Sequence, residues 1–444
     1  MLGSYNLLDE YTDRLVIKGW DQVRKPTNLA NNLATRLPAL GLIFLGEMDE
    51  FIRLHGGTLR PITPPFPEIC LIGVPDHNLG SAISRILADP ILATDIEYID
   101  PDFTMYLRKP TAQLGSNFDL YASGAKHGDY RSDLKIASAH AKNATGSQAR
   151  VAVIDTGVDP NILQTHFIDL TSAGLPSNTY VDGFGHGSAM VKIIQDVAPG
   201  SKIFAIRITD SQQVKLWEVM AGVKVAVFDV NISADIVNMS LGCNNVDWDC
   251  PRCGGKGYNR SAVFEAFLDT IQRQAGIGGN PDPIFVAAVG NAKQSDPFDW
   301  PARYGNTLAV GSIRRNTELS SFSNAATQKS GNEYCLCPGG EWDDQDTSKQ
   351  EWVGEGKDAN SNPTYCVGTS PATAYASAVL ALYRDHFLNE LKSAGRSQTL
   401  SSAEMMDEVY KRCDTSVAPN YDQKLHGRGR LVFNDASYTG GGGT

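Results

Sequence analysis

The sequence predicts an α/β protein with a mostly parallel sheet and helices on both faces, together with a small N-terminal α+β module. From residue 151 onward, short apolar runs alternate with helical patterns, the order typical of a parallel sheet wrapped on both sides. The chain has 444 residues, of which 42% are hydrophobic and 20% charged. This length and composition suit one large domain with a sizeable core and a smaller one.

The N-terminal module is expected over residues 38–108. Residues 1–37 are polar with scattered leucines, and we expect one or two short helices in this N-terminal segment. The β-α-β-α-β order that follows suits a small one-layer module. Its strands are expected at 42–45, 69–74 and 91–99, and its helices at 47–54 and 79–87. Residues 109–132 are polar and lack periodicity, so we expect a linker there.

The large domain is expected over residues 133–437. Strands are predicted at 151–154, 202–208, 236–239, 284–289 and 308–310, and helices at 187–196, 214–229 and 261–275. Residues 340–363 are rich in Asp, Gly, Asn and Ser, which indicates a surface insertion. The glycine-rich residues 438–444 are expected to form a flexible tail.

The charge balance limits the partners of the protein. The formal net charge is -11 and no basic stripe is present, which argues against a nucleic-acid or membrane-surface partner. No apolar run approaches the roughly 20 residues needed to span a bilayer. Residues 1–20 carry acids where an export signal needs basic and then apolar residues. A cytoplasmic location is therefore favoured, or secretion if a signal has been removed, and we expect a monomer.

A serine precedes a long helical pattern. Gly368, Thr369 and Ser370 lead into Pro371, and proline is well placed in a first helical turn. We therefore expect Ser370 to cap a buried helix at its positive end, which favours negative charge. A serine hydroxyl becomes a nucleophile only with a base beside it and donors for the oxyanion. An ordinary helix-capping serine is the alternative.

Two upstream stretches supply an acid and a base. Asp155 ends an apolar strand pattern, and the carboxyl ends of parallel strands face the usual ligand crevice. His186 lies between Gly185 and Gly187 just before a helical pattern, and these glycines allow a close approach of backbone or substrate. Taken singly, Asp155 could cap a helix and His186 could be a loop histidine.

Two further stretches complete the set. Asn291 follows the predicted strand at 284–289, and its amide could donate a hydrogen bond into the same crevice. Residues 238–242 begin apolar and end in Gly242, so their backbone edge could pair with an extended peptide.

These five pieces, in this order, resemble the subtilisin-like serine proteases, the subtilases, from about Asp133 to Ala436. The resemblance implies the subtilisin-like α/β fold and a serine endopeptidase. It makes Ser370 the nucleophile, His186 the general base and Asp155 the residue that orients the imidazole. It also assigns the oxyanion hole to Asn291 and the backbone N–H of Ser370.

The resemblance also implies a specificity pocket. Its walls would be Ser240, Leu241 and Gly242 on one side and Ala288, Val289 and Gly290 on the other. Asp299 would form the floor, where many relatives carry a small neutral residue. A buried carboxylate needs a cation, so we expect Arg or Lys before the scissile bond, as in Leu107-Arg108-Lys109 of the linker region. Alternatively, Asp299 faces solvent or caps a turn, or Asp296 takes its place.

The cysteines have no settled role. Cys243, Cys250 and Cys253 could hold a structural metal or form a disulfide, although no fourth ligand is evident. Cys335, Cys337 and Cys366 fall on apolar strands, where we expect buried free thiols. Catalysis of the implied kind requires no cofactor.

Three functions fit these observations. The first is an endopeptidase made as a zymogen, because the N-terminal module resembles the subtilase propeptide around residues 88–97. The second is a dedicated peptide-processing protease or transpeptidase with the same acyl-enzyme. The third is an inactive peptide-binding scaffold. In each case the partner is a protein or peptide.

Overall fold

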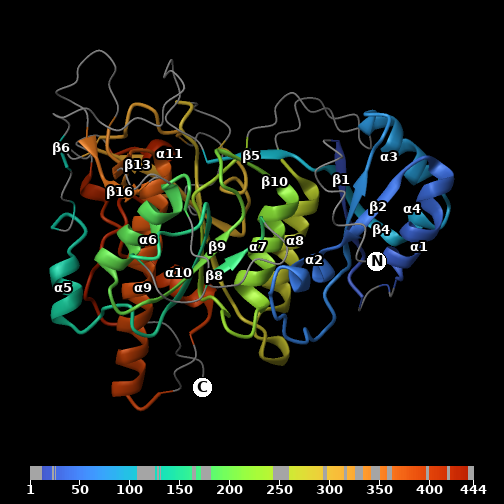
Figure 1. The fold of residues 1–444 in the computed structure, drawn as a ribbon. Helices are drawn as coiled ribbons and strands as arrows, with labels where there is room; N and C mark the ends of the chain where they lie inside the picture. Colours follow the sequence, from blue (N-terminus) through green and yellow to red (C-terminus); the bar gives the residue numbers. More distant parts are fainter. Residues whose placement is uncertain are drawn as a thin grey trace.

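The computed structural model is drawn in Figure 1. It describes residues 13–22, 25, 27–107, 126–127, 130, 132–162, 167–171, 182–243, 260–293, 298–314, 318–325, 334–341, 351–357, 363–396, 400–417 and 421–438. From left to right, Figure 1 shows one helical layer, a sheet, a second helical layer and the N-terminal module in blue.

A seven-stranded sheet forms the centre of the large domain. Its order is β14-β13-β12-β11-β7-β9-β8, and every pairing between these strands is parallel. The strands are β7 (Arg150–Asp155), β8 (Phe167–Asp169), β9 (Lys202–Arg207), β11 (Ile236–Met239), β12 (Ile284–Ala288), β13 (Thr307–Ile313) and β14 (Tyr334–Pro338). The predicted parallel α/β fold is confirmed.

Helices cover both faces of this sheet. Helices α6 (His186–Val197) and α9 (Thr369–Ser393) lie on one face, and α7 (Leu216–Phe228) and α8 (Ala262–Gln274) on the other (Figure 1). Strand β7 shows why, because Val151 and Val153 join the core with α6 and α9 while Ala152 and Ile154 join the core with α7 and α8. Alternate side chains of a strand point to opposite faces, so a strand apolar throughout is buried on both.

Shorter elements complete the large domain. They are α5 (Ile136–Ala141), β10 (Gln213–Lys215), η3 (Ile277–Gly279), α10 (Ser402–Tyr410), η6 (Thr415–Val417), α11 (Gln423–His426), β6 (Lys126–His127), β15 (Glu351–Trp352), β16 (Gly354–Lys357) and β17 (Pro363–Cys366). Strands β15 and β16 fall within the expected surface insertion. Strand β6, in the expected linker, pairs with β15, and β16 pairs with β17.

The N-terminal module contains a four-stranded antiparallel sheet in the order β2-β3-β1-β4. Its strands are β1 (Arg14–Gly19), β2 (Ile43–Glu47), β3 (Ile69–Gly73) and β4 (Ile96–Pro101). Its helices are α1 (Leu29–Arg36), η2 (Leu37–Leu40), α2 (Met48–Leu54), α3 (Leu79–Ala88) and α4 (Leu92–Asp95). The small α+β module is therefore present.

The expectation for residues 1–37 was right in part, because the short helix α1 lies there, but it missed β1, an inner strand of this sheet between β3 and β4. The module therefore begins before residue 38. Strand β1 was missed because charged residues flank its short apolar run. These residues, Arg14 and Lys18, are both buried. The Nε of Arg14 donates to Asp102 at 2.6 Å, and Lys18 pairs with Glu97. Their pairing with carboxylates permits this burial.

The strand expected at 91–99 was too long. Residues Leu92–Asp95 form the short helix α4 and only then does β4 begin. The carboxylate of Asp89 accepts hydrogen bonds from the N–H groups of Ile91 and Leu92, both at 3.0 Å. This local capping stabilises a helical turn against the extended conformation.

The module packs on α7 and α8 through an aromatic contact. Phe51 of α2 meets Trp217 with ring centroids 5.7 Å apart, and Phe66 meets Phe228 and Phe267 at 5.6 and 5.4 Å. All five rings are buried in one core with residues of β3, β7 and β11. The module and the large domain therefore share a hydrophobic core.

Two carboxylates of the module also accept hydrogen bonds from the starts of helices in the large domain. Asp100 accepts hydrogen bonds from the hydroxyl of Ser261 and the N–H of Val263 at the start of α8, at 2.9 and 2.8 Å. Asp102 accepts from the N–H of Trp217 at the start of α7, at 2.8 Å. The N-cap residue of α7, Lys215, makes no capping bond with its side chain. The module thus satisfies donors that the first turns of these helices leave open.

Candidate active site

The candidate residues gather at the carboxyl edge of the seven-stranded sheet. Asp155 is the last residue of β7, Ser240 follows β11, and Asn291 lies just beyond β12. These three strands are parallel neighbours, so their carboxyl ends meet at one edge. This edge is where open α/β sheets place their ligand crevice.

Asp155 and His186 form a buried pair. The Nδ1 of His186 lies 2.8 Å from the Oδ1 of Asp155, and only 3% and 1% of the two side chains are exposed. The Oδ1 atom also accepts the N–H of Thr156 at 2.8 Å, which holds the carboxylate in place. An ionised Asp155 assigns the proton to Nδ1, so Nε2 is the nitrogen that can accept a proton from a substrate or nucleophile.

The environment of His186 changes its basicity. Burial lowers the pKa of the imidazole, but the charge and hydrogen bond of Asp155 and the charge of Asp182 raise it more. The net result is a pKa above the usual 6.5. The negative charges of Asp155 and Asp182 therefore stabilise the imidazolium form of His186.

Asp182 is a residue of this site that the sequence interpretation missed. Its carboxylate accepts the Thr156 hydroxyl at 2.8 Å and three backbone N–H groups, those of Phe184, Gly185 and Ser188, at 2.7–3.1 Å. It therefore holds the turn that precedes α6 and positions His186, the first residue of that helix. The available signal was an acidic residue a few positions before a predicted helix start.

Ser370 lies in the first turn of α9. The helix begins at Thr369 and Gly368 is its N-cap, so the expectation that Ser370 is the capping residue was wrong. The Ser370 hydroxyl donates to the carbonyl oxygen of Ser240 at 3.0 Å, and the Ser240 hydroxyl donates back to the Ser370 carbonyl oxygen at 3.0 Å. These two bonds join the start of α9 to the end of β11.

The side chain of Asn291 is held in one orientation. Its Oδ1 accepts the N–H and the hydroxyl of Thr369, both at 2.9 Å. Its Nδ2 is thereby turned to the space beside Gly368, where a Cβ atom would come within 3.2 Å of it. An amide donor thus lies next to the backbone that carries Ser370.

The two expected pocket walls meet at Asp299. A Cβ on Gly242 would lie 2.8 Å from the Cβ of Asp299, and a Cβ on Gly290 would lie 2.7 Å from its Oδ2. The N–H of Asp299 donates to the carbonyl oxygen of Val289 at 3.0 Å. Asp299 is fully buried, which excludes the alternative that it faces solvent. Asp296 lies outside the described residues.

A family model supports the same interpretation. The model for the subtilase family matches residues 146–425, more than half of the chain. The chain belongs to the subtilase family. The match begins just before β7, ends within α11 and contains every candidate catalytic residue.

Curated relatives of this subtilase are distant in sequence. Subtilisin E of Bacillus subtilis is 28% identical over 227 residues, which cover 47% of this chain and 51% of the relative. Thermitase of Thermoactinomyces vulgaris is 29% identical over 198 residues, covering 40% of this chain and 60% of the relative. The chain spans about half the length of the first of these relatives.

A solved structure resembles the subtilase over nearly its whole length. It is the crystal structure of a mutant of the epidermin leader peptide processing serine protease (EpiP) from Staphylococcus aureus. The TM-score is 0.63 at 17% identity, with 94% of this chain and 97% of that chain covered. At this identity the likeness shows a shared fold.

The cysteines of the subtilase follow the expectation in part. Cys335, Cys337 and Cys366 are buried free thiols, and burial raises the pKa of the Cys366 thiol. Cys250 and Cys253 lie outside the described residues, so a staple with Cys243 stays a prediction. Within the described part of the chain, no group of three or more His, Cys, Asp or Glu side chains could hold a metal ion. None of the helices described there is both long and apolar enough to cross a membrane.

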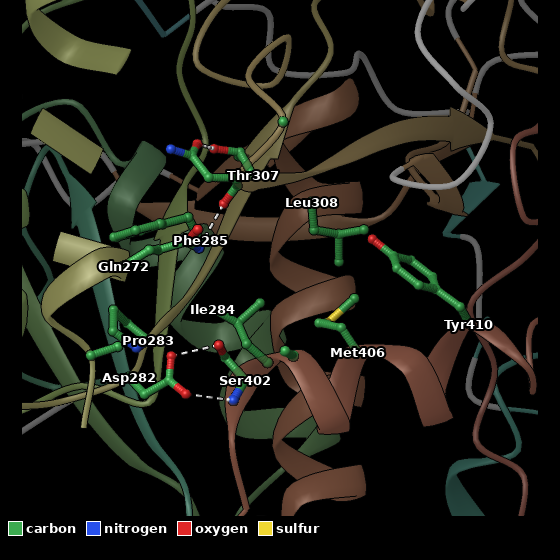
Figure 2. A pocket seen from close by; sticks show the side chains of 14 residues that line it. Gln272, Asp282, Pro283, Ile284, Phe285, Thr307, Leu308, Ser402, Met406 and Tyr410 are labelled. Atoms are coloured by element: carbon green, nitrogen blue, oxygen red, sulfur yellow. Dashed lines mark hydrogen bonds between the residues drawn. The ribbon is translucent and has the colours of Figure 1, made fainter. Parts of the chain in front are cut away.

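A separate cavity of about 570 Å³ lies at the amino ends of β12 and β13 (Figure 2). Figure 2 shows Asp282 hydrogen-bonded to the N–H and hydroxyl of Ser402, at 2.8 and 2.5 Å. Met406 and Tyr410 of α10 line another side. The candidate active site is at the carboxyl ends of the strands, so this cavity belongs to the opposite edge of the sheet.

Proposed function

We propose that this subtilase is a serine endopeptidase that cleaves peptide bonds through an acyl-enzyme on Ser370. The observation that carries the proposal is the buried Asp155–His186 pair at the same sheet edge as Ser370. A buried imidazole with a raised pKa and a proton-accepting Nε2 is suited to general-base catalysis.

The proposed mechanism assigns a step to each residue. The Ser370 hydroxyl turns from the Ser240 carbonyl to His186, whose Nε2 takes its proton while Oγ attacks the scissile carbonyl. The backbone N–H of Ser370 and the Nδ2 of Asn291 stabilise the oxyanion. His186 then protonates the leaving amine, and water hydrolyses the ester by the reverse sequence. Asp155 holds the imidazole and stabilises its charged form.

These steps use protein groups and water alone, so we propose that catalysis needs no cofactor. We also propose that the enzyme acts as a monomer on a protein or peptide. A structural metal or disulfide at Cys243, Cys250 and Cys253 would lie outside the proposed reaction.

We further propose that the chain is made as a zymogen. Strand β5 (Thr104–Tyr106), near the end of the module, pairs antiparallel with β10. Tyr106 and Gly242 also exchange backbone hydrogen bonds, with N···O distances of 2.8 and 2.9 Å. The last strand of the module therefore occupies the edge that an extended substrate would use, which supports autoinhibition.

A serine-directed fluorophosphonate probe tests the proposed activity. We expect labelling of the wild-type chain and none of the Ser370→Ala chain. An inactive scaffold would leave both unlabelled. Product masses measured with and without an added amine separate hydrolysis from transpeptidation, because only a transpeptidase joins the acyl group to the amine.

The free module should inhibit the cleaved enzyme. A fragment of residues 13–108 contains all four strands of the sheet, so we expect it to fold and to inhibit peptide hydrolysis at micromolar concentration. A fragment of residues 38–108 lacks β1, the strand between β3 and β4, and is expected not to inhibit. Equal inhibition by both fragments, or by neither, would contradict this role of the module.

Replacing Asn291 with alanine should slow the chemical step. Loss of an oxyanion donor lowers kcat by about 10²–10³-fold, with KM little changed because the donor acts in the transition state. Steady-state kinetics on a peptide substrate measure this, with the thermal unfolding midpoint as a control for the lost bonds to Thr369. A change confined to KM would contradict the assignment of Asn291 to the oxyanion hole.

A further inference from the structure

Resting on the proposed peptidase activity, we propose that Asn238 positions the nucleophile Ser370 through Ser240. Ser377 of α9 orients the amide of Asn238. These four residues form one hydrogen-bonded network between β11 and α9, and each is at most 4% exposed. Three observations carry the proposal: the place of Asn238 in the sheet, the direction of each hydrogen bond in the network, and the contact of the network with the first turn of α9.

Asn238 is the polar member of an apolar layer. The register of the parallel strands places Asn238 between Val153 of β7 and Val286 of β12. The same layer continues to Ala205 of β9 and Leu308 of β13, and these four neighbours all belong to the core with α6 and α9. An amide inside such a layer loses its hydration and is tolerated only with hydrogen-bond partners. The partners of Asn238 therefore show what its burial achieves.

The next layer toward the carboxyl edge of the sheet contains groups of the candidate active site. Side chains of a strand return to the same face every second residue, so this layer carries Asp155 at the end of β7 and Ser240 just after β11. Asn238 therefore lies one layer below the site, on the side of α9. Because Asn238 is fully buried, any effect that it has on the reaction passes through the residues that it contacts.

The hydrogen bonds of Ser240 have a fixed direction. The Nδ2 of Asn238 can only donate, and it lies 3.0 Å from the Oγ of Ser240. The Ser240 hydroxyl therefore accepts this bond, and it donates its own proton to the carbonyl oxygen of Ser370 at 3.0 Å. Without the amide of Asn238, no donor would hold the lone pairs of this hydroxyl in one orientation. Asn238 thus directs the Ser240 proton to the backbone of the nucleophile.

Ser377 determines which end of the amide faces Ser240. The hydroxyl of Ser377 donates to the Oδ1 of Asn238 at 3.0 Å. An amide turned over would present its Oδ1 to Ser240, and this acceptor would draw the Ser240 proton away from Ser370. Ser377 lies about two helical turns after Ser370 on the same face of α9, so both ends of the network belong to one helix.

The network holds one side of the first turn of α9, and Asn291 holds the other. Ser240 and Ser370 exchange two hydrogen bonds, since the Ser370 hydroxyl also donates to the Ser240 carbonyl oxygen at 3.0 Å. Thr369 donates its N–H and its hydroxyl to Asn291, both at 2.9 Å. Two amide side chains, one from β11 and one after β12, thus fix the backbone that carries the nucleophile. A misplacement of about 1 Å can slow a reaction about 100-fold, so loss of the Asn238 amide should slow the attack.

A purely structural role for the network leads to a different expectation. Apolar side chains of similar shape can replace a buried polar network with little change in stability, whereas removal of one partner leaves the other unsatisfied. Leucine has the same branched shape as asparagine, and Ser377→Ala removes the hydroxyl that Asn238→Leu would leave without its acceptor. The double variant Asn238→Leu/Ser377→Ala therefore keeps an apolar core but loses the orientation of Ser240. A structural role predicts that this variant is active, and a positioning role predicts that it is not.

Steady-state kinetics and thermal unfolding of the full chain test the proposal. We expect the double variant to keep an unfolding midpoint near that of wild type while kcat falls by about 10–100-fold, with KM little changed because a buried Asn238 does not contact the substrate. Ser377→Ala alone should lower kcat by a smaller factor. Thr270→Val is the matched control, because it removes a buried hydroxyl of α8 that donates to the carbonyl oxygen of Ala266, and it should change neither kcat nor KM.

Two further measurements assign the loss to the nucleophile. The Asp155–His186 pair lies on β7 and α6, outside the network, so the acidic limb of the kcat/KM profile should stay at the wild-type pH in the double variant. The rate of labelling by a fluorophosphonate should fall by about the same factor as kcat, because both reactions need the Ser370 hydroxyl in place. A labelling rate equal to that of wild type, or a displaced acidic limb, would contradict the proposal.

The outcomes separate this proposal from the proposed activity. If wild type binds no fluorophosphonate and cleaves no peptide, the peptidase activity fails and the positioning role fails with it. If wild type is active and the double variant keeps its kcat, the network is structural and only the positioning role is wrong. If the double variant does not fold, Ser377→Ala decides, because an unchanged kcat in that variant would contradict the orientation of Asn238 by Ser377.

Discussion

We expect Ser370→Ala to lower kcat for peptide hydrolysis by about 10⁶-fold, the largest effect of any single substitution in this chain. The substitution removes the nucleophile, and without it neither the acyl-enzyme nor the proton transfer to His186 can occur. His186→Ala should cause a loss of similar size, because the two residues act as one unit. Kinetics on a peptide substrate at high enzyme concentration can measure the residual rate.

The double variant provides the control. If Ser370 and His186 act together, Ser370→Ala combined with His186→Ala should lose no more activity than either single variant. Additive losses would contradict a shared role. Ser370→Ala removes only the hydroxyl bond to Ser240, so the unfolding midpoint should change little. Turnover by Ser370→Ala within tenfold of wild type would refute the assignment of the nucleophile.

The second large effect is expected for Asp155→Asn, with a loss of about 10⁴-fold in kcat. An amide in place of the carboxylate no longer fixes the proton on Nδ1 of His186, so Nε2 is often protonated and cannot act as the base. The carboxylate also raises the pKa of His186, by its charge and by its hydrogen bond at 2.8 Å. The substitution should therefore change the pH profile as well as the rate.

The direction of the pH change follows from the proton on His186. Only neutral His186 is a base, so activity falls as the pH drops through its pKa, which in wild type is above 6.5. Without the charge of Asp155 this pKa falls, and the acidic limb of the kcat/KM profile should move to lower pH. A purely structural role for Asp155 would reduce activity without moving this limb. An unchanged limb would thus contradict the proposed pairing.

Much of the large domain could be predicted because its signals are local. The run 284–289 is apolar throughout, as is typical of strands buried on both faces, and the observed β12 covers Ile284–Ala288. Asp155, His186 and Asn291 each stand at the end of a strand pattern or the start of a helical one. Parallel strands bring such ends together, and the resemblance to the subtilases then assigned these candidates to one site.

The remaining features depend on contacts between distant residues. Strand β1 is buried with Arg14 and Lys18, whose partners Asp102 and Glu97 lie about 80 residues further along the chain. The role of Asp182 depends on three backbone N–H groups that face it only after the turn before α6 has formed. The pairing of Tyr106 with Gly242 likewise joins β5 to the residues that follow β11, which lie far apart in the sequence. Periodicity within a short window contains no information on such pairs.

The contact of Asp100 with α8 couples docking of the module to proton uptake. In the docked state, burial raises the pKa of Asp100 to about 6, although hydrogen bonds from Val263 and Ser261 and the charge of Arg260 lower it. In a separated module this carboxylate would face water, with an ordinary pKa near 3.8. Because docking raises its pKa, Asp100 stabilises the docked state most below pH about 4. This stabilisation is lost as the pH rises through about 6. If the chain is made as a zymogen, as proposed, we expect Asp100 to make the cleaved module dissociate more readily at neutral pH than in acid.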